Sequence, residues 1–422
     1  MQKSQSALTN QVAIVGAGMG KFGAFPEKNS RDLFVEAYLS MLNSVDNKFD
    51  PGEIDALYVG NYSSDLFEHQ GHTAPMMADA VGLVPIPATR VEDACASGSA
   101  ALRQGIMAIA SGMADLVLVG GVEKMTNLPT AEVTDALATA GDTIFETPAG
   151  FTFPGFYAAI ATAYMHQYGM TPEHLMNVAV KNHDNVALNP LAQFNVTILD
   201  WMESRKASAE RKGKPVPIWK DVGEFLHDDR ANPMIAWPLR LFDCSPITDG
   251  AAVLLLASQA WAHEFTDDPI WIRASTQASD AALHDRQELT SLPAARLAAQ
   301  KAYTMAGVTS QDISIAEVHD CFTIAEIVAT EDLGFFRPGE GYKAAEDGVT
   351  ARQGTRPVNT SGGLKSKGHP VGASGVAQVV EIWKQMRGEA GERQVAGDIS
   401  LALTHNVGAT GNTCIVHIFE RV

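Results

Sequence analysis

Cys95 stands immediately before a run of small residues of the kind that opens a helix, because the segment 96–100 reads Ala-Ser-Gly-Ser-Ala. A thiol at the first turn of a helix faces unpaired backbone N–H groups and the positive end of the helix dipole, which lower its pKa from about 8.5 and favour the thiolate. The same N–H groups can bind an oxyanion. A small buried cysteine more often serves packing alone. A catalytic role for Cys95 therefore depends on the residues that accompany it.

His369 lies in a glycine-rich loop, 368–375, that reads Gly-His-Pro-Val-Gly-Ala-Ser-Gly and leads into a helix. Glycines allow the backbone to approach a ligand closely. The imidazole can take a thiol proton or donate to a thioester oxygen. A single loop histidine is more often structural or merely exposed, so a catalytic role for His369 also depends on other residues nearby.

Two further segments follow predicted strands, where sites gather in α/β folds. His319, Asp320 and Cys321 follow a strand expected over 313–318, and the small residues of 405–411 follow a strand expected over 399–404. Asp320 can equally serve as a helix cap, and 405–411 taken alone is a turn. No further histidine, cysteine or acidic residue stands at the spacing of metal ligands, so we expect no metal site.

Apolar runs alternate with amphipathic helical stretches on both sides of a central segment, which is typical of an α/β protein. Before that segment the patterns predict strands over 12–16, 56–60 and 116–121 and helices over 30–42, capped by Ser30, and from 96 to about 112. After it they predict strands over 249–256 and 270–274 and a helix over 291–306. The central segment, about 126–240, loses this rhythm and contains an exposed charged stretch over 203–220. We interpret it as an inserted loop-and-helix domain.

The two α/β parts look like diverged copies. The helix start at 96–100 has a counterpart at 373–377, which reads Ala-Ser-Gly-Val-Ala, and the strand at 54–60 has one at 313–318. We therefore expect three domains: a first half made of 1–125 with 241–265, an inserted loop domain over 126–240, and a second half over 266–422.

The bulk properties exclude several classes of protein. A formal net charge of −18 disfavours nonspecific binding to nucleic acid or anionic membranes. The four cysteines lie far apart, without a CxxC pair, which fits neither a disulfide framework nor a zinc site and favours a reducing compartment. Segment 1–6 lacks the apolar core of a signal peptide, 420–422 is no peroxisomal tripeptide, and no window suits a membrane span. We expect a soluble, cytoplasmic protein.

Taken together, these segments supply a nucleophile, a base, a second acid/base and oxyanion sites, as carbon–carbon chemistry on a thioester requires. From Val12 to Glu420 the chain resembles the thiolase superfamily. More narrowly it is similar to the sterol-carrier-protein type of thiolase, because the block that reads Asn-Glu-Ala-Phe in many thiolases is here His-Asp-Cys-Phe at 319–322. The resemblance implies an α/β duplicated thiolase fold, five-layered αβαβα, with an inserted loop domain.

The resemblance also implies roles for the site residues. Cys95 would attack an acyl-CoA to give an acyl-enzyme. His369 would activate this cysteine and, with His319, contribute to one oxyanion hole. The backbone N–H groups of Cys95 and Gly408 would form the other.

Most thiolases carry a second catalytic cysteine in a Cys-x-Gly loop near the C-terminus, where this chain has Asn406. In the sterol-carrier type the acid/base cysteine comes from the other motif, which assigns that role to Cys321. Ser245 matches a serine that contacts the pantetheine arm of CoA in relatives. Cys244 and Cys414 are expected to be structural, and the cations of 203–220 either bind CoA phosphates or decorate the surface.

The predicted activity is that of an acetyl-CoA acetyltransferase or 3-ketoacyl-CoA thiolase, an acyltransferase of lipid and fatty-acid metabolism. It would pass an acyl group between a 3-oxoacyl-CoA and CoA, by Claisen condensation or its thiolytic reverse, with CoA as substrate and no cofactor. The expected assembly is a homodimer or homotetramer. The alternatives are a retro-aldolase for a steroid side-chain or other β-hydroxyacyl-CoA, which often needs a small accessory subunit, and a noncatalytic acyl-CoA or lipid carrier. A β-ketoacyl synthase is disfavoured, because no second histidine stands in its usual context.

Overall fold

The structure is a computed structural model that describes residue 8 and residues 11–422, so the prediction made for segment 1–6 lies outside it. Its main sheet has nine strands in the order β3-β2-β4-β7-β1-β8-β11-β10-β9. The strands are β1 (Val12–Met19), β2 (Ala56–Gly60), β3 (Ala88–Val91), β4 (Leu116–Glu123), β7 (Gly250–Ser258), β8 (Ile270–Ser279), β9 (Ile315–Glu317), β10 (Leu401–Gly408) and β11 (Thr413–Arg421). A separate hairpin joins β5 (Met234–Ala236) and β6 (Leu239–Arg240).

The helices fall into three groups along the chain. Those before the insertion are α1 (Ser30–Leu42), α2 (Ser64–Phe67), α3 (Thr73–Ala80) and α4 (Ser97–Ala110). The insertion contains α5 (Thr130–Ala138), α6 (Phe153–Tyr168), α7 (Pro172–Val186), α8 (Ile198–Arg211) and α9 (Val222–His227). After it come α10 (Ala262–Phe265), α11 (Pro293–Ala306), α12 (Thr323–Asp332), α13 (Gly341–Glu346), α14 (Gly363–Lys367) and α15 (Val371–Met386).

The two halves of the sheet repeat one arrangement of strands. In the first half β2 runs parallel to β4, and β4 runs antiparallel to β7. In the second half β9 runs parallel to β10, and β10 runs antiparallel to β11. The predicted duplication is confirmed: segments 54–60 and 313–318 contain β2 and β9, and segments 96–100 and 373–377 lie at the beginnings of α4 and α15.

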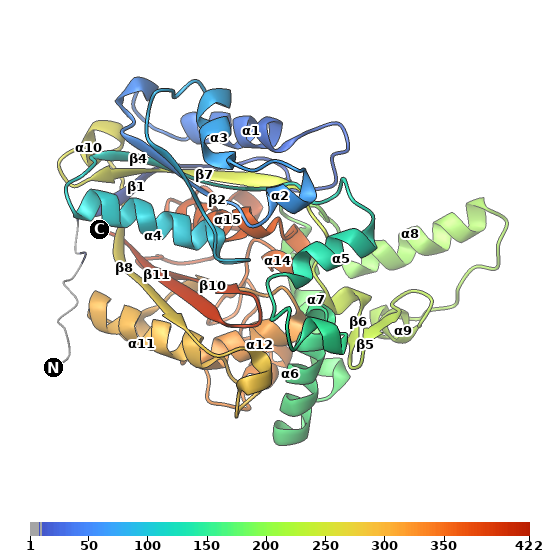
Figure 1. Cartoon of the computed structure of the whole chain (residues 1–422). Helices are drawn as coiled ribbons and strands as arrows, with labels where there is room; N and C mark the ends of the chain where they lie inside the picture. The colour runs from blue at the N-terminus through green and yellow to red at the C-terminus, as the bar shows by residue number, and fades with distance from the viewer. Residues whose placement is uncertain (1–7, 9–10) are drawn as a thin grey trace.

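Five layers are visible in Figure 1, and the predicted fold is confirmed. The helices α1 and α3 cover the first half of the sheet on the outside, and α11 and α12 cover the second half. The helices α4 and α15 lie between the two halves, where apolar residues of α15 such as Val376, Val379 and Ile382 are fully buried. This middle layer positions two helix beginnings side by side.

Close approach of these beginnings depends on glycine. A Cβ atom on Gly98 of α4 would lie 2.8 Å from the carbonyl oxygen of Gly372 in α15, and a Cβ on Gly121 of β4 would lie 2.3 Å from the same oxygen. Neither space admits a side chain. The residues that precede α4 and α15, Cys95 and His369, are therefore brought together.

The insertion lies to one side of the layers, and α8 projects away from the body (green in Figure 1). Residues of the charged stretch 203–220 are mostly exposed, as predicted. The division into three domains stays a prediction. None of the helices that the structure describes is long and apolar enough to cross a bilayer.

Three local predictions were wrong. The N-cap of α1 is Asn29 rather than Ser30, because the Asn29 side chain accepts hydrogen bonds from the backbone N–H groups of Arg31 and Asp32. The strand β10 continues through Gly408, since it stays paired with β11, so 405–408 is no loop. The helix α15 begins at Val371, so the later glycines of segment 368–375 are helical.

Candidate active site

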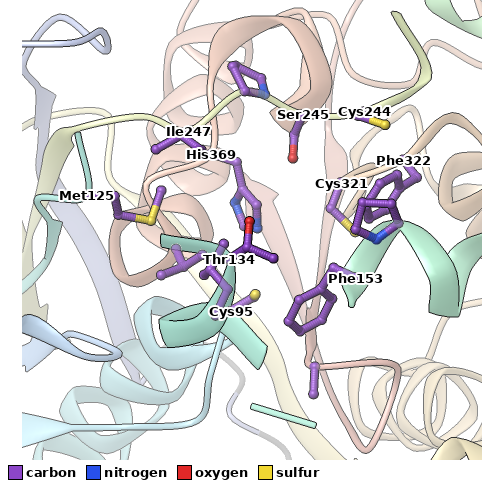
Figure 2. Close-up of a pocket in the computed structure, with 15 residues that line it drawn as sticks. Cys95, Met125, Thr134, Phe153, Cys244, Ser245, Ile247, Cys321, Phe322 and His369 are labelled. Carbon is purple, nitrogen blue, oxygen red and sulfur yellow. The ribbon is translucent and has the colours of Figure 1, made fainter. Parts of the chain in front are cut away.

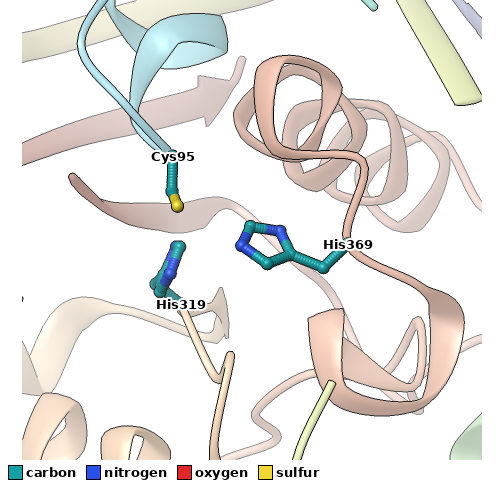
Figure 3. A group of neighbouring side chains, drawn as sticks. All are labelled: Cys95, His319 and His369. Carbon is teal, nitrogen blue, oxygen red and sulfur yellow. The ribbon is translucent and has the colours of Figure 1, made fainter. Parts of the chain in front are cut away.

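Cys95, His319 and His369 come from three distant parts of the chain and meet at one point. The Cys95 sulfur and one ring nitrogen of each histidine lie within 4.8 Å of one another (Figure 3). Cys95 precedes α4, His369 precedes α15, and His319 follows β9. All three side chains are buried. The structure thus brings together the three residues that the sequence singled out separately.

The Cys95 thiol is desolvated, and this decides its protonation state. The residue is 7% exposed. Burial raises the pKa of Cys95 to about 12, although the backbone N–H of Ala409 donates a hydrogen bond to the sulfur and lowers it in part. The expectation of a lowered thiol pKa was wrong, because desolvation outweighs the helix start. The free protein holds Cys95 as a thiol.

His369 is arranged as a neutral base. Its Nδ1 lies 2.7 Å from the Oγ of Ser374, whose hydroxyl donates to the carbonyl oxygen of Pro370 at 3.0 Å. Because the Ser374 hydroxyl uses its only proton in that hydrogen bond, its oxygen can only accept from His369. Nδ1 of His369 therefore carries the ring proton, and Nε2 carries the lone pair. Figure 3 shows this outer nitrogen directed toward Cys95 and His319. Burial lowers the pKa of His369 to about 3, which keeps the ring neutral.

His319 has the opposite tautomer. The side-chain amide of Asn406 donates to its Nδ1 at 3.0 Å, so the proton resides on Nε2. This Nε2 is buried and has no hydrogen-bond partner among the residues that the structure describes. Burial lowers the pKa of His319 well below its usual value. A protonated Nε2 is a hydrogen-bond donor for a substrate oxygen and has no lone pair for a metal ion.

Cys321 belongs to the same cavity and has a partner that the sequence did not reveal. The hydroxyl of Tyr157, in α6 of the insertion, hydrogen bonds with the Cys321 sulfur and also lies 3.4 Å from the carbonyl oxygen of Ala409. The Tyr157 ring stacks on Phe322 with a centroid separation of 4.7 Å. Burial raises the pKa of the Cys321 thiol well above its usual value. No sequence motif surrounds Tyr157, so it is identified as a partner of Cys321 only by the position of α6 in the structure.

A mostly apolar cavity of about 150 Å³ borders Cys95, Cys321 and His369, whereas His319 and Tyr157 are not part of its lining. Its lining includes Cys95, Cys321, His369, Ser245 and Cys244, and Figure 2 shows the Ser245 hydroxyl directed into it. Cys244, expected to be structural, therefore borders the site. Cys414 is buried in β11, as a structural cysteine would be.

Gly408 lies at the end of β10, close to the Cys95 loop but outside the lining of the cavity. A Cβ on Gly408 would lie 2.7 Å from the carbonyl oxygen of Asp93. The next residue, Ala409, lines the cavity in the left-handed region at φ +54° and supplies the N–H that reaches Cys95. The predicted contribution of the Gly408 N–H to an oxyanion hole stays a prediction.

Comparison with known proteins places this site in a family. Residues 12–260 match the thiolase N-terminal domain, and residues 275–421 match the thiolase C-terminal domain-like family. The chain belongs to the thiolase family. It is an acyltransferase of the thiolase type, as the sequence predicted.

Two relatives and one solved structure show how far the similarity extends. The chain is 47% identical to the acetyl-CoA acetyltransferase of Methanothermobacter thermautotrophicus, over 97% of this chain and 99% of the relative. It is 32% identical to sterol carrier protein 2 of Bos taurus, over 99% of this chain and 73% of the relative. The solved Ltp2-ChsH2(DUF35) aldolase is 25% identical and superposes with a TM-score of 0.79, covering 99% of both chains.

In this thiolase a buried carboxylate anchors the helix turn that follows His369. Glu123, at the end of β4, accepts hydrogen bonds from the backbone N–H groups of Tyr62 at 2.8 Å and Gly372 at 3.0 Å. It thereby ties β4 to the first turn of α15, directly after His369. Burial raises the pKa of Glu123 to about 7. Glu123 was not predicted from the sequence, although its place at a strand end, two residues after the pair Gly120 and Gly121, was a usable signal.

Proposed function

We propose that this thiolase passes an acyl group between a 3-oxoacyl-CoA and CoA through an acyl-enzyme on Cys95, with acetoacetyl-CoA as the smallest such substrate. One observation carries the proposal: a buried thiol, a neutral imidazole with a free lone pair and a second thiol border one apolar cavity. The name of the 47% identical relative, acetyl-CoA acetyltransferase, supports the same reaction.

In the thiolytic direction the first step makes the acyl-enzyme. The Cys95 thiol gives its proton to Nε2 of His369 as the sulfur attacks the 3-oxo carbonyl carbon. The bond between C2 and C3 then breaks, and its electron pair moves to C2. Nε2–H of His319 donates to the thioester oxygen of the enolate that forms, and the Cys321 thiol protonates C2 to give acetyl-CoA.

The second step regenerates the enzyme. CoA gives its thiol proton to the Cys321 thiolate, and its sulfur attacks the thioester carbonyl on Cys95. The Cys95 sulfur leaves and takes back the proton held by His369, so all three groups return to their neutral forms. Condensation is the same sequence in reverse, with Cys321 removing the α-proton of acetyl-CoA.

A retro-aldolase is the second candidate, because the chain superposes along its whole length on a solved aldolase. Splitting a β-hydroxyacyl-CoA needs an acid and a base but no covalent acyl intermediate. The pairing of Cys95 with the lone pair of His369 has no purpose in that reaction, and it favours acyl transfer.

Incubation of the protein with acetoacetyl-CoA and CoA tests the proposal. We expect two molecules of acetyl-CoA for each acetoacetyl-CoA consumed, and no turnover by Cys95→Ala. Absence of acetyl-CoA would contradict the proposal and leave a carrier role. Release of an aldehyde or ketone from a β-hydroxyacyl-CoA, without added CoA, would establish the aldolase reaction instead.

The predicted homodimer or homotetramer, accessory subunit and cytoplasmic location stay proposals. Light scattering coupled to size-exclusion chromatography measures the oligomeric state directly. A mass equal to that of one chain would contradict the predicted homodimer or homotetramer.

A further inference from the structure

A second cavity adjoins the catalytic one. It has a volume of about 160 Å³ and shares the segment Cys244, Ser245 and Pro246 with the catalytic cavity. Figure 2 shows the Ser245 hydroxyl directed into the catalytic cavity and the Cys244 sulfur directed away from it. The rest of its lining comes from the insertion, the turn that follows it and α14: His183, Phe194, Trp201, Arg205, Leu241, Phe242 and Lys365.

Lys365 is the unusual member of this lining. Four lysines of the described part of the chain are buried, and three of them have a carboxylate partner: Lys124 pairs with Asp249, Lys181 with Glu326 and Lys367 with Glu317. Lys365 is 2% exposed, yet its ammonium has no hydrogen bond or ion pair with any residue that the structure describes. Its nearest aromatic contact is the ring of Phe242, with 5.9 Å from Nζ to the centroid. Burying an unpaired ammonium costs free energy unless a ligand supplies an opposite charge or a hydrogen-bond acceptor.

A second donor points to the same conclusion. Nε1–H of Trp201 is buried and has no acceptor among the described residues. Both unpartnered groups are donors, and neither has an acceptor side chain within hydrogen-bonding reach. Burial lowers the pKa of Lys365 to about 8, so the ammonium stays charged at neutral pH. The cavity is thus mostly apolar, with the Lys365 ammonium and the Trp201 N–H as its buried donors without a hydrogen-bond partner in the described part of the chain, while Asp243, Asp320 and Glu326 act on Lys365 only from beyond hydrogen-bonding distance.

We propose that this second cavity binds a carboxylate at the far end of the acyl group, so that the substrates include 3-oxoacyl-CoAs of dicarboxylic acids. This inference rests on the proposed function. Lys365 would pair with the carboxylate, Trp201 would donate to it, and the aromatic rings would contact the methylene chain.

Two observations favour an acyl carboxylate over a phosphate of CoA. Lys365 lies on α14, only four residues before His369, whereas the phosphates lie a full pantetheine arm away from the thioester. A single buried ammonium also balances one negative charge, while phosphate sites usually combine several cations or backbone N–H groups. Arg205 is exposed at the rim and does not change this balance.

Binding to the nonreactive Cys95→Ala protein tests the inference without relying on turnover. Glutaryl-CoA and pentanoyl-CoA have acyl groups of equal carbon number and differ in a terminal carboxylate against a methyl group. By calorimetry we expect glutaryl-CoA to bind about tenfold more tightly, as for a hydrogen bond to a charged group. Adding Lys365→Met should remove this preference, and Trp201→Phe should reduce it. Lys220→Met, at a lysine with an 80% exposed side chain, is the matched control and should leave it unchanged.

Three binding outcomes would overturn the assignment. Equal affinities for the two thioesters would show that the cavity does not recognise the carboxylate. A preference that survives both Lys365→Met and Trp201→Phe would place the carboxylate elsewhere. Weaker binding of CoA itself in the Lys365→Met protein would assign the ammonium to the phosphates. Failure of acetoacetyl-CoA thiolysis in the wild-type protein, with the preference intact, would instead count against the proposed function.

Discussion

The side-chain amide of Asn406 donates a hydrogen bond to Nδ1 of His319 at 3.0 Å. Position 406 is where most thiolases carry a catalytic cysteine, so the asparagine exchanges an acid/base group for a positioning one. The proton of His319 is fixed on Nε2, inside the site. In the proposed mechanism the acid/base work at C2 then falls to Cys321.

The substitution Asn406→Asp should therefore remove the amide that donates to Nδ1 of His319 while leaving the His319 ring in place. A carboxylate at 406 accepts from Nδ1–H, which moves the proton away from Nε2. Loss of one oxyanion donor lowers kcat by about 10² to 10³. Steady-state thiolysis of acetoacetyl-CoA measures it.

The matched control is Asn195→Asp, which introduces the same charge at an exposed position. His319→Ala should cause a similar loss, and the double variant should be no worse than either single one, because both act through one hydrogen bond. Additive losses would show that Asn406 acts independently of His319.

Tyr157→Phe should slow the carbon–carbon step selectively. The variant keeps the ring stacked on Phe322 and removes only the hydroxyl beside the Cys321 sulfur. One neutral hydrogen bond corresponds to a loss of about tenfold. Exchange of the α-protons of acetyl-CoA in D₂O reports the Cys321 step, and acetylation of Cys95 reports the other. Equal losses in the two assays would mean that Tyr157 only supports the fold.

The protonation state of Cys95 can be tested by alkylation without substrate. Burial raises the pKa of Cys95 to about 12, so the thiolate is a small fraction at pH 7 and grows about tenfold for each pH unit. The rate of iodoacetamide modification of Cys95 should rise steadily from pH 6 to pH 10. A plateau at or below pH 8 would reveal a resting thiolate–imidazolium pair instead.

Gly121→Ala should destabilise the middle layer. The added Cβ would lie 2.3 Å from the carbonyl oxygen of Gly372 and 2.8 Å from the Cα of Ala373. Overpacking of this kind costs about 1–3 kcal/mol of unfolding free energy. Urea unfolding measures the change, and Gly71→Ala, where a Cβ meets nothing within 4 Å, is the control. Equal stability of the two variants would show that β4 and α15 separate freely.

Local patterns predicted much of the fold. The bounds of α1 and β2 agree with those expected at 30–42 and 56–60, because their apolar periodicity is a property of the segment itself. The continuation of β10 through Gly408 was missed, because it depends on pairing with β11 rather than on the composition of 405–408.

The site was predictable as residue types but not as an electrostatic arrangement. Cys95, His319, Cys321 and His369 were found from motifs and from the family resemblance. The upward shift of the Cys95 pKa was not predicted, because it depends on how completely the insertion and both halves of the sheet exclude water from the thiol. Tyr157 was missed because its partner is 164 positions away and no local pattern connects Tyr157 with Cys321.

The whole mechanism depends on the division of labour between the two cysteines, and the Cys321→Ala protein isolates it. After incubation with acetyl-CoA and acid quenching, intact-mass and peptide analysis should find an acetyl group on Cys95 in both the wild-type and the Cys321→Ala protein, formed more slowly in the variant because CoA leaves without a proton from Cys321. The variant should form no acetoacetyl-CoA and exchange no α-protons. An acetyl group on Cys321, or an unmodified Cys95 in the wild-type protein, would contradict the account.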